Sequence, residues 1–530
     1  MKKTIKNILI VGGGSSGWMA ASAFYHCLGN DCNISLVESK NIPIVGVGES
    51  TIIGFKRFIK LVGLKDEEWM KECNATYKNS IRFTNFYKND GTSFHYPFGG
   101  KIDKQSMLDW SFFAAKDKNL TNDSFCEFHN DNFHLAKWNR NTRNKDGLLK
   151  HFDFSEDTAY HFDATAFGQF LKRKFDKVNH YIDDIIGVEK DEDGYLTCIL
   201  GESGHKYEAD LYVDCTGFRS FLLEQQMGSE FLSYKPWLSN DRAIAAHLPY
   251  TDKQTQLTNY TDCTGLSSGW VWNIPLWNRM GTGYVYSSDF IDDDAAEKEF
   301  KKYLGTEDIQ ITRKIQIRHG VRKNGWVKNV VGVGLSYAFI EPLESTGLVS
   351  THVVIAQIIE LLQRKKYNLT GFDIDGYNYS AQLNMNNFRN FVSIHYKLSS
   401  RADTPYWKYQ TQEKDWWKVW DDEKDERKFH KFTIKNAGVM FDNFYEMIHF
   451  FHSNAHIWPP EFDGLAYIMA GMGYKPIDDY YADLISMDAE KQRQMKNVYQ
   501  NWKRHAANLT EKVQKLPSSY EFMRDNVYEK

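Results

Sequence analysis

Several features are scarce or absent in this chain of 530 residues, and each absence argues against a class of protein. Its 7 cysteines are odd in number, scattered, and form no C-x-x-C pair, which argues against structural zinc and favours a reducing compartment. The chain has no long basic run and a formal net charge of -4, so a nucleic-acid-binding surface has no support. No segment reaches the ~20 apolar residues that a membrane span needs. We therefore expect a soluble, cytoplasmic protein without a metal site.

Internal repeats and low-complexity linkers are also absent. Beyond residue 363 the pattern turns mostly helical, at 379–394, 407–420, 444–451 and 485–513. We therefore expect a second subdomain that packs on the first, with frayed residues at its C-terminal end. Aromatic residues make up 15% of the chain. This content is compatible with an enzyme for a flat ligand, but it more often reflects a filled interior.

The N-terminal segment has the pattern of a strand, a glycine turn and a helix. A β-branched run at 4–11 leads into the turn, and a helical sequence follows it. The turn consists of Gly12, Gly14, Ser15, Ser16 and Gly17. At G-x-G-x-x-G spacing the first glycine makes the bend, the second admits a pyrophosphate, and the third lets helix and strand pack closely. Glu38 ends a second strand, at the ~20-residue offset where an acid binds a ribose hydroxyl. These features predict a dinucleotide-binding α/β fold.

A second glycine loop follows this unit at 45–51. It ends in Gly48, Glu49, Ser50 and Thr51, just before a helical pattern that begins near Phe55. We interpret it as a second loop against a flat cofactor, with backbone amides making the contact. Alternatively, Ser50 or Thr51 caps the helix, and both interpretations can hold together.

The segment 339–348 reads Phe-Ile-Glu-Pro-Leu-Glu-Ser-Thr-Gly-Leu. A strand-like run at 329–338 precedes it, and a helical pattern at 348–363, apolar on nearly every side, indicates a buried helix. Ser345 and Thr346 are expected to cap that helix, and Gly347 lets a ligand approach the backbone. A helix N-terminus attracts a ring carbonyl, a halide or a phosphate. Glu344 at its edge is therefore a candidate catalytic carboxylate, although a capped core helix explains the pattern equally well.

Three aromatic or charged segments complete the pattern. Lys78 lies in a strand-like alternation at 75–83, where a lone lysine is usually exposed to solvent. Trp270 and Trp272 share one face of a strand that forms a hairpin with 281–287, and they either shield a site or pack a core. The run 94–100 is aromatic and turn-forming, which is typical of a pocket rim.

Taken together, several motifs resemble the flavin-dependent halogenases of the tryptophan-halogenase type. They are Gly12-x-Gly14-x-x-Gly17, Gly46-Val47-Gly48-Glu49-Ser50-Thr51, Ala75-Thr76-Tyr77-Lys78, Trp270-x-Trp272-x-Ile274-Pro275, Glu341-Pro342-Leu343-Glu344-Ser345-Thr346-Gly347, His395-Tyr396-Lys397-Leu398 and Asp403-Thr404-Pro405. The glycine motif marks only a dinucleotide fold. The tryptophan, lysine and glutamate motifs are far more specific.

The resemblance implies a fold and a cofactor. The fold is a two-dinucleotide-type, Rossmann-like α/β flavoprotein with a second β-sheet. Residues 1–365 would form the FAD-binding unit, with an insertion near 85–155 on the substrate side. Residues 366–530 would form a mainly helical subdomain that covers the substrate. The cofactor-binding residues would be Gly12, Gly14, Ser15, Ser16, Gly17, Glu38, Gly48, Glu49, Ser50, Thr51 and Leu343.

It also implies a reaction. Reduced FAD, supplied by a separate reductase as diffusible flavin, would use O2 to convert a halide at the Thr346 and Gly347 amides into hypohalous acid. Lys78 would then hold the oxidant by a hydrogen bond or as a haloamine, since an amine suits this role and burial lowers its pKa. Glu344 would polarise the oxidant or take the proton from the substrate. Ser345 would link the flavin to the lysine. The residues that shield the flavin would be Trp270, Trp272, Ile274 and Pro275.

The chain departs from the family at the substrate end. Tryptophan-halogenating members have Tyr-His-Pro-Phe at the pocket rim, whereas this chain has His95-Tyr96-Pro97-Phe98. Phe98, Tyr96 and Trp458 are the candidate substrate residues. The family's clamp for the amino-acid end of free tryptophan has no clear match, so another electron-rich aromatic, such as an indole or a phenol, is at least as suitable. The halide, the regiochemistry and the oligomeric state, including a homo-oligomer, are left open.

Two alternatives use the same fold. A flavin-dependent aromatic monooxygenase would let its substrate reach the flavin. A flavin-binding protein without catalysis would leave Lys78 and Glu344 without a common site.

Overall fold

The first strand, β1 (Asn7–Val11), lies inside a six-stranded sheet in the order β20-β21-β12-β1-β2-β8. In this computed structural model the described residues are 4–41, 48–100, 102, 104–416, 463–473, 483 and 485–529. The other strands of this sheet are β2 (Asn33–Glu38), β8 (Asn179–Ile182), β12 (Leu211–Asp214), β20 (Trp326–Val327) and β21 (Val330–Gly332). All of them pair in parallel except β20 with β21. The predicted dinucleotide-binding fold is confirmed.

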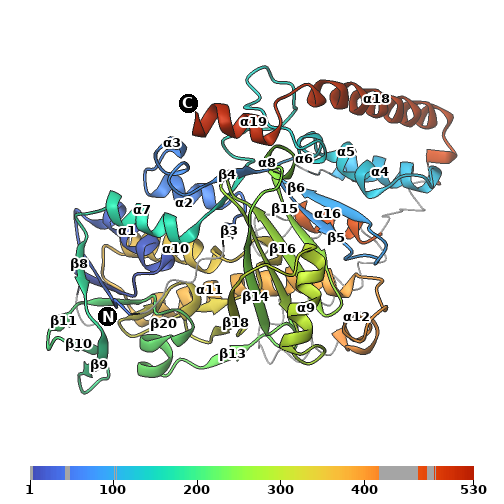
Figure 1. Cartoon of the computed structure of the whole chain (residues 1–530). Helices are drawn as coiled ribbons and strands as arrows, with labels where there is room; N and C mark the ends of the chain where they lie inside the picture. Colours follow the sequence, from blue (N-terminus) through green and yellow to red (C-terminus); the bar gives the residue numbers. More distant parts are fainter. Residues whose placement is uncertain are drawn as a thin grey trace.

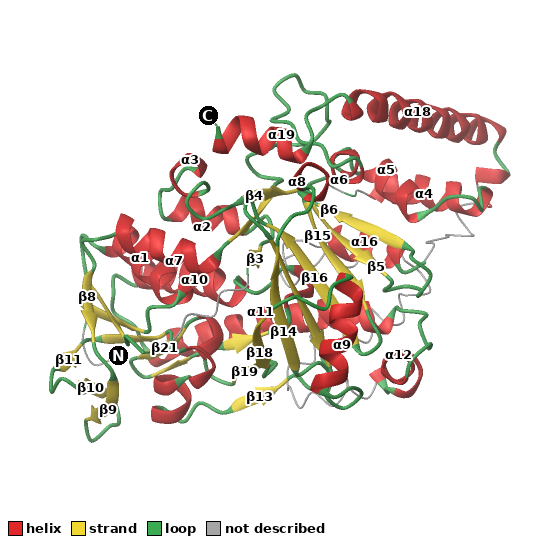
Figure 2. Ribbon diagram, viewed as in Figure 1, coloured by secondary structure: helices red, strands yellow, loops and turns green. Residues whose placement is uncertain are grey.

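Helices cover this sheet on the side of the glycine turn. The helix predicted after that turn is α1 (Ser15–Leu28), and it packs against α7 (Ala164–Lys174) and α10 (Val349–Arg364) (Figure 2). Asp163 begins α7 as a side-chain cap, because its Oδ1 accepts hydrogen bonds from the amides of Thr165 and Ala166. The three helices fix the position of the turn between β1 and α1.

A second, seven-stranded sheet stands beside the first, in the order β18-β14-β17-β16-β15-β5-β6 (Figure 1). Its strands are β5 (Ser80–Thr84), β6 (Ser93–Pro97), β14 (Arg242–Leu248), β15 (Tyr260–Gly265), β16 (Gly269–Pro275), β17 (Met280–Tyr286) and β18 (Ile311–Gln316). The predicted tryptophan hairpin is confirmed as β16 and β17, with Trp270 opposite Val285. Only β15 and β5 pair in parallel here.

A small sheet joins these two parts of the molecule. It consists of β3 (Glu49–Ser50), β7 (Ala159–Phe162) and β4 (Thr76–Lys78), in the order β3-β7-β4. The alternation predicted at 75–83 is therefore two strands in two sheets, separated at Asn79. Because Lys78 is the last residue of β4, it lies at the junction of the small sheet and the seven-stranded sheet.

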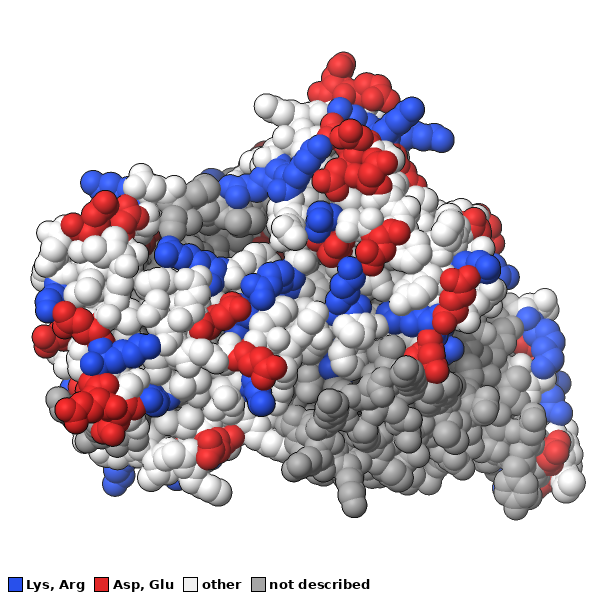
Figure 3. All heavy atoms as spheres, turned by 90° about the horizontal axis from the view of Figure 1, so that it is seen from below, with Lys and Arg blue, Asp and Glu red and all other residues white. Residues whose placement is uncertain are grey.

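The remaining short elements close the edges. They are α2 (Phe55–Leu61), α3 (Asp66–Trp69), β9 (Ile185–Lys190), β10 (Leu196–Gly201), β11 (Lys206–Glu208), β13 (Phe231–Ser233), α8 (Lys253–Gln256), α9 (Asp293–Leu304), β19 (Gly320–Arg322) and β22 (Ala338–Phe339). Acidic and basic side chains are interspersed on the face shown in Figure 3. That face therefore carries no extended field of one sign over its described residues.

The predicted buried helix at 348–363 is confirmed as α10, but its predicted caps are wrong. Leu348 occupies the cap position and makes no side-chain capping bond. Ser345 instead ends a short 3₁₀ turn (Pro342–Glu344) in the left-handed region, with φ 58°. This backbone conformation is sterically unfavourable for a serine. Its hydroxyl is turned towards Lys78, as described below.

The remaining helices pack around the sheets. They are α4 (Lys104–Lys116), α5 (Asn122–His129), α6 (Phe133–Lys137), α11 (Gly371–Lys397), α12 (Pro405–Lys408), α16 (Asp463–Gly471), α18 (Ala489–Gln514) and α19 (Ser519–Met523). α18 contacts α5 and α6, and α16 contacts β6 (Figure 1). The helices predicted at 379–394 and 485–513 are confirmed as α11 and α18, whereas 444–451 lies outside the described residues. Among the described helices, none has the length and apolarity that crossing a bilayer requires.

The expectation of a frayed C-terminal end is wrong for the described residues. Phe522 and Met523 are buried, and the Tyr528 hydroxyl donates a hydrogen bond to the Ala75 carbonyl at 2.9 Å. The Tyr528 ring stacks on Trp277 at a centroid distance of 4.0 Å. These contacts hold the end of the chain against β4.

Candidate functional site

A cavity of about 890 Å³ lies between the two large sheets. Its lining includes the glycine turn, the end of β2, the start of the small sheet, the β16 strand and the segment before α10. The predicted cofactor residues on its wall are Gly12, Gly14, Ser15, Ser16, Glu38, Gly48, Glu49 and Ser50. Gly14 and Gly48, which belong to different glycine loops, therefore face one space.

The geometry of the glycine turn fits a pyrophosphate. Gly12 has φ +110°, and a Cβ there would lie 2.4 Å from the Cys215 carbonyl oxygen. A Cβ at Gly17 would lie 1.9 Å from the Gly12 carbonyl oxygen, so only glycine lets α1 approach β1 this closely. At Gly14 a Cβ would meet no atom within 4 Å. The backbone at Gly14 is thus open to a ligand in the cavity.

Glu38 is oriented by two basic side chains. Its Oε1 accepts a hydrogen bond from Lys172 Nζ at 2.8 Å and contacts His180 Nε2 at 2.7 Å. Its Oε2 lies beside Gly13, where an added Cβ would approach within 1.7 Å. One oxygen is therefore anchored and the other faces the glycine turn, as ribose recognition requires.

The segment before α10 presents free backbone donors. The amides of Thr346 and Gly347 donate no hydrogen bond within the part of the chain that the structure describes. Gly347 lines the cavity. Glu341 anchors this segment: its Oε2 accepts hydrogen bonds from Trp270 Nε1 and Asn240 Nδ2 at 3.0 and 2.7 Å, and its Oε1 accepts one from the Tyr396 hydroxyl. The amides of Thr346 and Gly347 can therefore donate hydrogen bonds to an anion bound in the cavity.

Glu49 faces the same amides. A Cβ at Gly347 would lie 2.9 Å from Glu49 Oε2. Burial raises the pKa of this carboxyl to about 7, because a poorly solvated site disfavours the charged form. At lower pH the group beside the anion site is therefore neutral.

Lys78 is completely buried, which the alternation at 75–83 did not predict. Its Nζ donates hydrogen bonds to the Thr51 carbonyl at 2.9 Å and to Ser345 Oγ at 2.6 Å. It lies 4.9 Å from the centre of the Phe98 ring. Lys78 does not line the cavity. Ser50 does line it, and Ser50 Oγ lies 3.0 Å from Ser345 Oγ. The ammonium group is thus two hydrogen bonds away from the cavity.

Glu344 is also buried, and it contacts a residue that sequence reasoning did not select. Its Oε1 lies 2.5 Å from His395 Nε2, both side chains being at most 2% exposed. His395 Nδ1 lies 3.1 Å from the Phe391 carbonyl, which can only accept, so Nδ1 carries a hydrogen. The His395 imidazole therefore lies directly against the Glu344 carboxyl in a buried site. No sequence signal links these residues, which are 51 positions apart.

The two tryptophans have different surroundings although they share one face of β16. Trp272 and Ile274 line the cavity, whereas Trp270 is buried behind them and held by Glu341. The rings lie 6.2 Å apart in an edge-to-face arrangement. Pro275 is turned away from the cavity, and its carbonyl accepts a hydrogen bond from Thr76 Oγ1.

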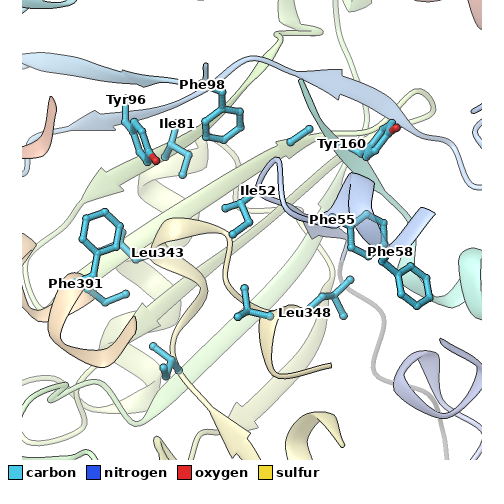
Figure 4. Close-up of a cluster of buried hydrophobic side chains, with 14 of the residues drawn as sticks. Ile52, Phe55, Phe58, Ile81, Tyr96, Phe98, Tyr160, Leu343, Leu348 and Phe391 are labelled. Carbon is cyan, nitrogen blue, oxygen red and sulfur yellow. The ribbon is translucent and has the colours of Figure 1, made fainter. Parts of the chain in front are cut away.

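Phe98 and Tyr96 lie beside Ile81 in a cluster of buried apolar side chains (Figure 4). Phe98 and Tyr96 pack edge to face at 5.6 Å, and Tyr96 stacks on Tyr467 of α16 at 6.1 Å. Leu343 lies within this apolar cluster and not on the cavity wall. Trp458 lies outside the described residues.

The displaced histidine of the rim motif is on the other face of the sheet. Side chains alternate along β6, where His95 is opposite Arg82 and Tyr96 is opposite Ile81. His95 Nδ1 lies 2.9 Å from Ser80 Oγ, and burial lowers its pKa to about 3. The pocket side therefore presents Tyr96 in place of an imidazole.

Comparison with known proteins agrees with this geometry. The family model for tryptophan halogenases matches residues 7–478. Tryptophan 7-halogenase RebH from Lentzea aerocolonigenes is 31% identical over 551 residues, which cover 99% of each chain. The apo structure of VirX1 superposes with a TM-score of 0.90 at 40% identity, covering 99% of this chain and 100% of that one. Tar14, a tryptophan C-6 flavin-dependent halogenase from taromycin biosynthesis, superposes with a TM-score of 0.80 at 30% identity, covering 98% and 99%.

The fold, the cofactor cavity and these matches agree over nearly the whole chain. The chain therefore belongs to the tryptophan halogenase family and is a flavin-dependent halogenase.

Proposed function

We propose that this enzyme forms hypohalous acid in the cavity and passes it through Lys78 to an electron-rich aromatic substrate. The observation that carries the proposal is the position of Lys78. Its amine is buried, is linked to the cavity wall through Ser345 and Ser50, and lies near the ring of Phe98. A carrier between an oxidant source and an aromatic ring needs this placement.

The residues present fit FAD. The glycine turn would hold the pyrophosphate, Glu38 a ribose, and the amides of Thr346 and Gly347 a halide, with Trp272 and Ile274 along the ring. When bound and reduced, FAD supplies the electrons with which O2 and halide are converted to hypohalous acid. Trp272 excludes an aromatic substrate from that space, so that halide is the group that is oxidised there.

Glu344 would act as the base at the substrate carbon. Aromatic halogenation produces a cationic ring that must lose a proton, and a nearby carboxylate accepts it. His395 is a positioning residue, because its buried imidazole lies against the Glu344 carboxyl and limits the directions that the carboxyl can take. Because Glu344 and Lys78 both contact or adjoin Ser345, they can act on one substrate.

The substrate would be an indole or another electron-rich aromatic, bound against Phe98 and Tyr96. We further propose that 1–365 form the FAD-binding unit and that 366–530 cover the substrate. The contact between α16 and β6 supports the second part, since a Cβ at Gly464 would lie 2.6 Å from the Tyr96 hydroxyl.

A separate reductase would supply FADH2 as diffusible flavin. The free thiol state of all seven cysteines supports a reducing, cytoplasmic setting. We leave a homo-oligomer open to measurement.

The experiment that tests this function combines the protein with a flavin reductase, NADH, FAD and chloride, bromide or iodide. A panel of indoles, phenols and free tryptophan is offered, and products are identified by mass. We expect halogenated indole or phenol. Hydroxylated product without halogenated product, from any halide, would contradict the proposal.

Halide binding is expected to weaken as pH rises through about 7. The neutral Glu49 carboxyl below its pKa leaves the Gly347 amide available to an anion, whereas the ionised form repels it. The apparent KM for bromide should rise by up to about 10-fold per pH unit above that pKa. Steady-state kinetics at several pH values measures the effect.

Glu49→Gln is the matched control, since it keeps the shape and removes the titration. Its bromide KM should be independent of pH over the same range. The same slope in both proteins, or no slope in the wild type, would reject this role of Glu49.

A further inference from the structure

A second buried histidine lies near Lys78 although no motif marked it. His161 is in β7, where it is opposite Thr76 of β4. Its imidazole is 0% exposed. Its Nδ1 lies 3.1 Å from Thr76 Oγ1, and its Nε2 lies 2.9 Å from Thr261 Oγ1. Both ring nitrogens are therefore occupied by hydroxyl groups and not by a charged partner.

An unbroken row of hydroxyls joins this histidine to the lysine. Thr261 Oγ1 lies 2.6 Å from Ser50 Oγ, and Ser50 Oγ lies 3.0 Å from Ser345 Oγ. Ser345 Oγ accepts the hydrogen bond of Lys78 Nζ at 2.6 Å. Every separation lies within the range of a hydrogen bond between these groups. Segments up to 295 residues apart in the chain supply the row.

The hydrogen bond from Thr76 to the Pro275 carbonyl sets the direction of every hydrogen bond in the row. Thr76 Oγ1 lies 2.7 Å from the Pro275 carbonyl, which can only accept, so the Thr76 hydroxyl donates there. Thr76 Oγ1 therefore accepts from His161 Nδ1, which carries the hydrogen of the neutral ring. His161 Nε2 is then an acceptor, and the Thr261 hydroxyl must donate to it.

The hydrogen bonds between Thr261 and Lys78 point in the same direction. Because Thr261 donates to the histidine, it accepts from Ser50, and Ser50 accepts from Ser345. Ser345 accepts from Lys78, which has hydrogens to give. All donors thus point from Lys78 Nζ towards His161 Nε2, which is the arrangement that lets a proton move by successive transfer.

We propose that Ser345, Ser50 and Thr261 conduct a proton from Lys78 to His161, so that Lys78 can react as a neutral amine. The inference rests on the proposed function, which supplies hypohalous acid. His161 is the transient proton acceptor in this scheme, and the three hydroxyls are positioning residues. The row also touches the cavity wall at Ser50 and Thr261.

The chemistry balances along this route. The Lys78 ammonium gives one proton through the row to His161 Nε2. The neutral amine then attacks the halogen of hypohalous acid, forming an N–halogen bond and releasing water. The proton returns from His161 to the haloamine, which transfers its halogen to the ring carbon and leaves as the amine. Glu344 takes the ring proton, and return of that proton to the Lys78 amine restores the ammonium and the carboxylate, so the net reaction converts hypohalous acid and aromatic substrate to halogenated product and water.

The charge of Lys78 disfavours a proton on His161, so the two groups do not both carry a positive charge. Burial, and then the charge of Lys78, lower the pKa of His161 well below its usual value. When the proton leaves Lys78 that repulsion ends, which makes His161 a better acceptor. The other titratable groups near the row are Glu49 on β3, Cys263 on β15, Glu344 before α10 and His395 on α11. Burial raises the pKa values of Glu49 and Cys263.

Thr261→Val tests the inference because it removes the hydroxyl and keeps the shape. In single turnovers with reduced FAD, bromide and an indole, flavin oxidation should proceed as in the wild type. Formation of bromoindole should fall by about 10²-fold. Its rate should increase with pH in the variant, since solvent must now deprotonate Lys78, and much less in the wild type.

Two controls make the result decisive. Thr261→Ser restores the hydroxyl and should restore both rate and pH profile. Thr282→Val removes another buried hydroxyl of the same sheet and should change neither. Equal rates and pH profiles in Thr261→Val and wild type would overturn the inference, as would a loss that Thr261→Ser does not rescue. Absence of bromoindole from the wild type would instead contradict the proposed function itself.

Discussion

Replacing Lys78 with alanine or methionine is expected to lower halogenation by about 10³-fold or more, while FAD binding persists. The amine is the group placed between the cavity and the aromatic cluster, by hydrogen bonds to Ser345 and Thr51 and by its contact with the Phe98 ring. It does not line the cavity, so its removal leaves the flavin site intact. Methionine keeps the packing of the side chain and removes the reactive nitrogen.

Lys56→Met is the matched control. Lys56 is another buried lysine, whose Nζ donates to the Phe154 carbonyl at 2.7 Å and which lies away from the row of hydroxyls. Burial lowers the pKa of Lys56 to about 8. Lys56 and Lys78 are both buried lysines, but they lie at different places in the fold. The Lys56→Met enzyme should halogenate at the wild-type rate per mole of folded protein. Turnover of Lys78→Met at the wild-type rate, with FAD titration and thermal melts normal in both variants, would remove Lys78 from the mechanism.

Glu344→Gln is expected to lower turnover by about 10²-fold and to change which step limits the rate. The wild-type carboxylate removes the ring proton quickly, so deuterium at the halogenated carbon should have almost no effect on the rate. Without that base, proton loss becomes slow, and the same deuterated indole should react measurably more slowly than the unlabelled one. Competition between the two substrates, read by mass, measures the isotope effect.

Glu299→Gln provides a comparison at another carboxylate, on α9. Glu299 accepts hydrogen bonds from the hydroxyls of Ser267 and Tyr284 at the edge of the same sheet, outside the proposed site. It should show neither the loss nor the isotope effect. A Glu344→Gln enzyme without an isotope effect would mean that another group takes the proton.

Features set by local pattern were predictable from the sequence. The glycine turn, the tryptophan hairpin and the helix α10 all have their periodicity within ~20 residues, and each is present. The motifs that carry the family resemblance also lie within short segments. Local patterning therefore accounts for the cofactor end of the molecule.

Features set by distant partners were not predictable. Ser345 looked like a helix cap, but its hydroxyl bonds to Lys78, 267 residues away, and its backbone adopts φ 58°. Lys78 looked exposed by its alternation, and only the resemblance indicated its role. His395 lies in a motif of the family resemblance, but neither it nor His161 was predicted as a site residue, because their importance comes from which residues the fold brings beside them.

The C-terminal end illustrates the same limit. A short, polar final segment favours fraying. However, the Tyr528 hydroxyl donates a hydrogen bond to the Ala75 carbonyl, and its ring stacks on Trp277. Tertiary contacts of this kind override local propensity.

The most direct test of the account is the product of one turnover under ¹⁸O2 with reduced FAD, bromide and an indole. The central claim is that an amine carries oxidised halide to the ring, so the substrate does not meet the flavin. The account predicts bromoindole that contains no ¹⁸O in the wild type, and almost none of it from Lys78→Met. Hydroxyindole carrying ¹⁸O, with no bromine incorporated, would contradict it.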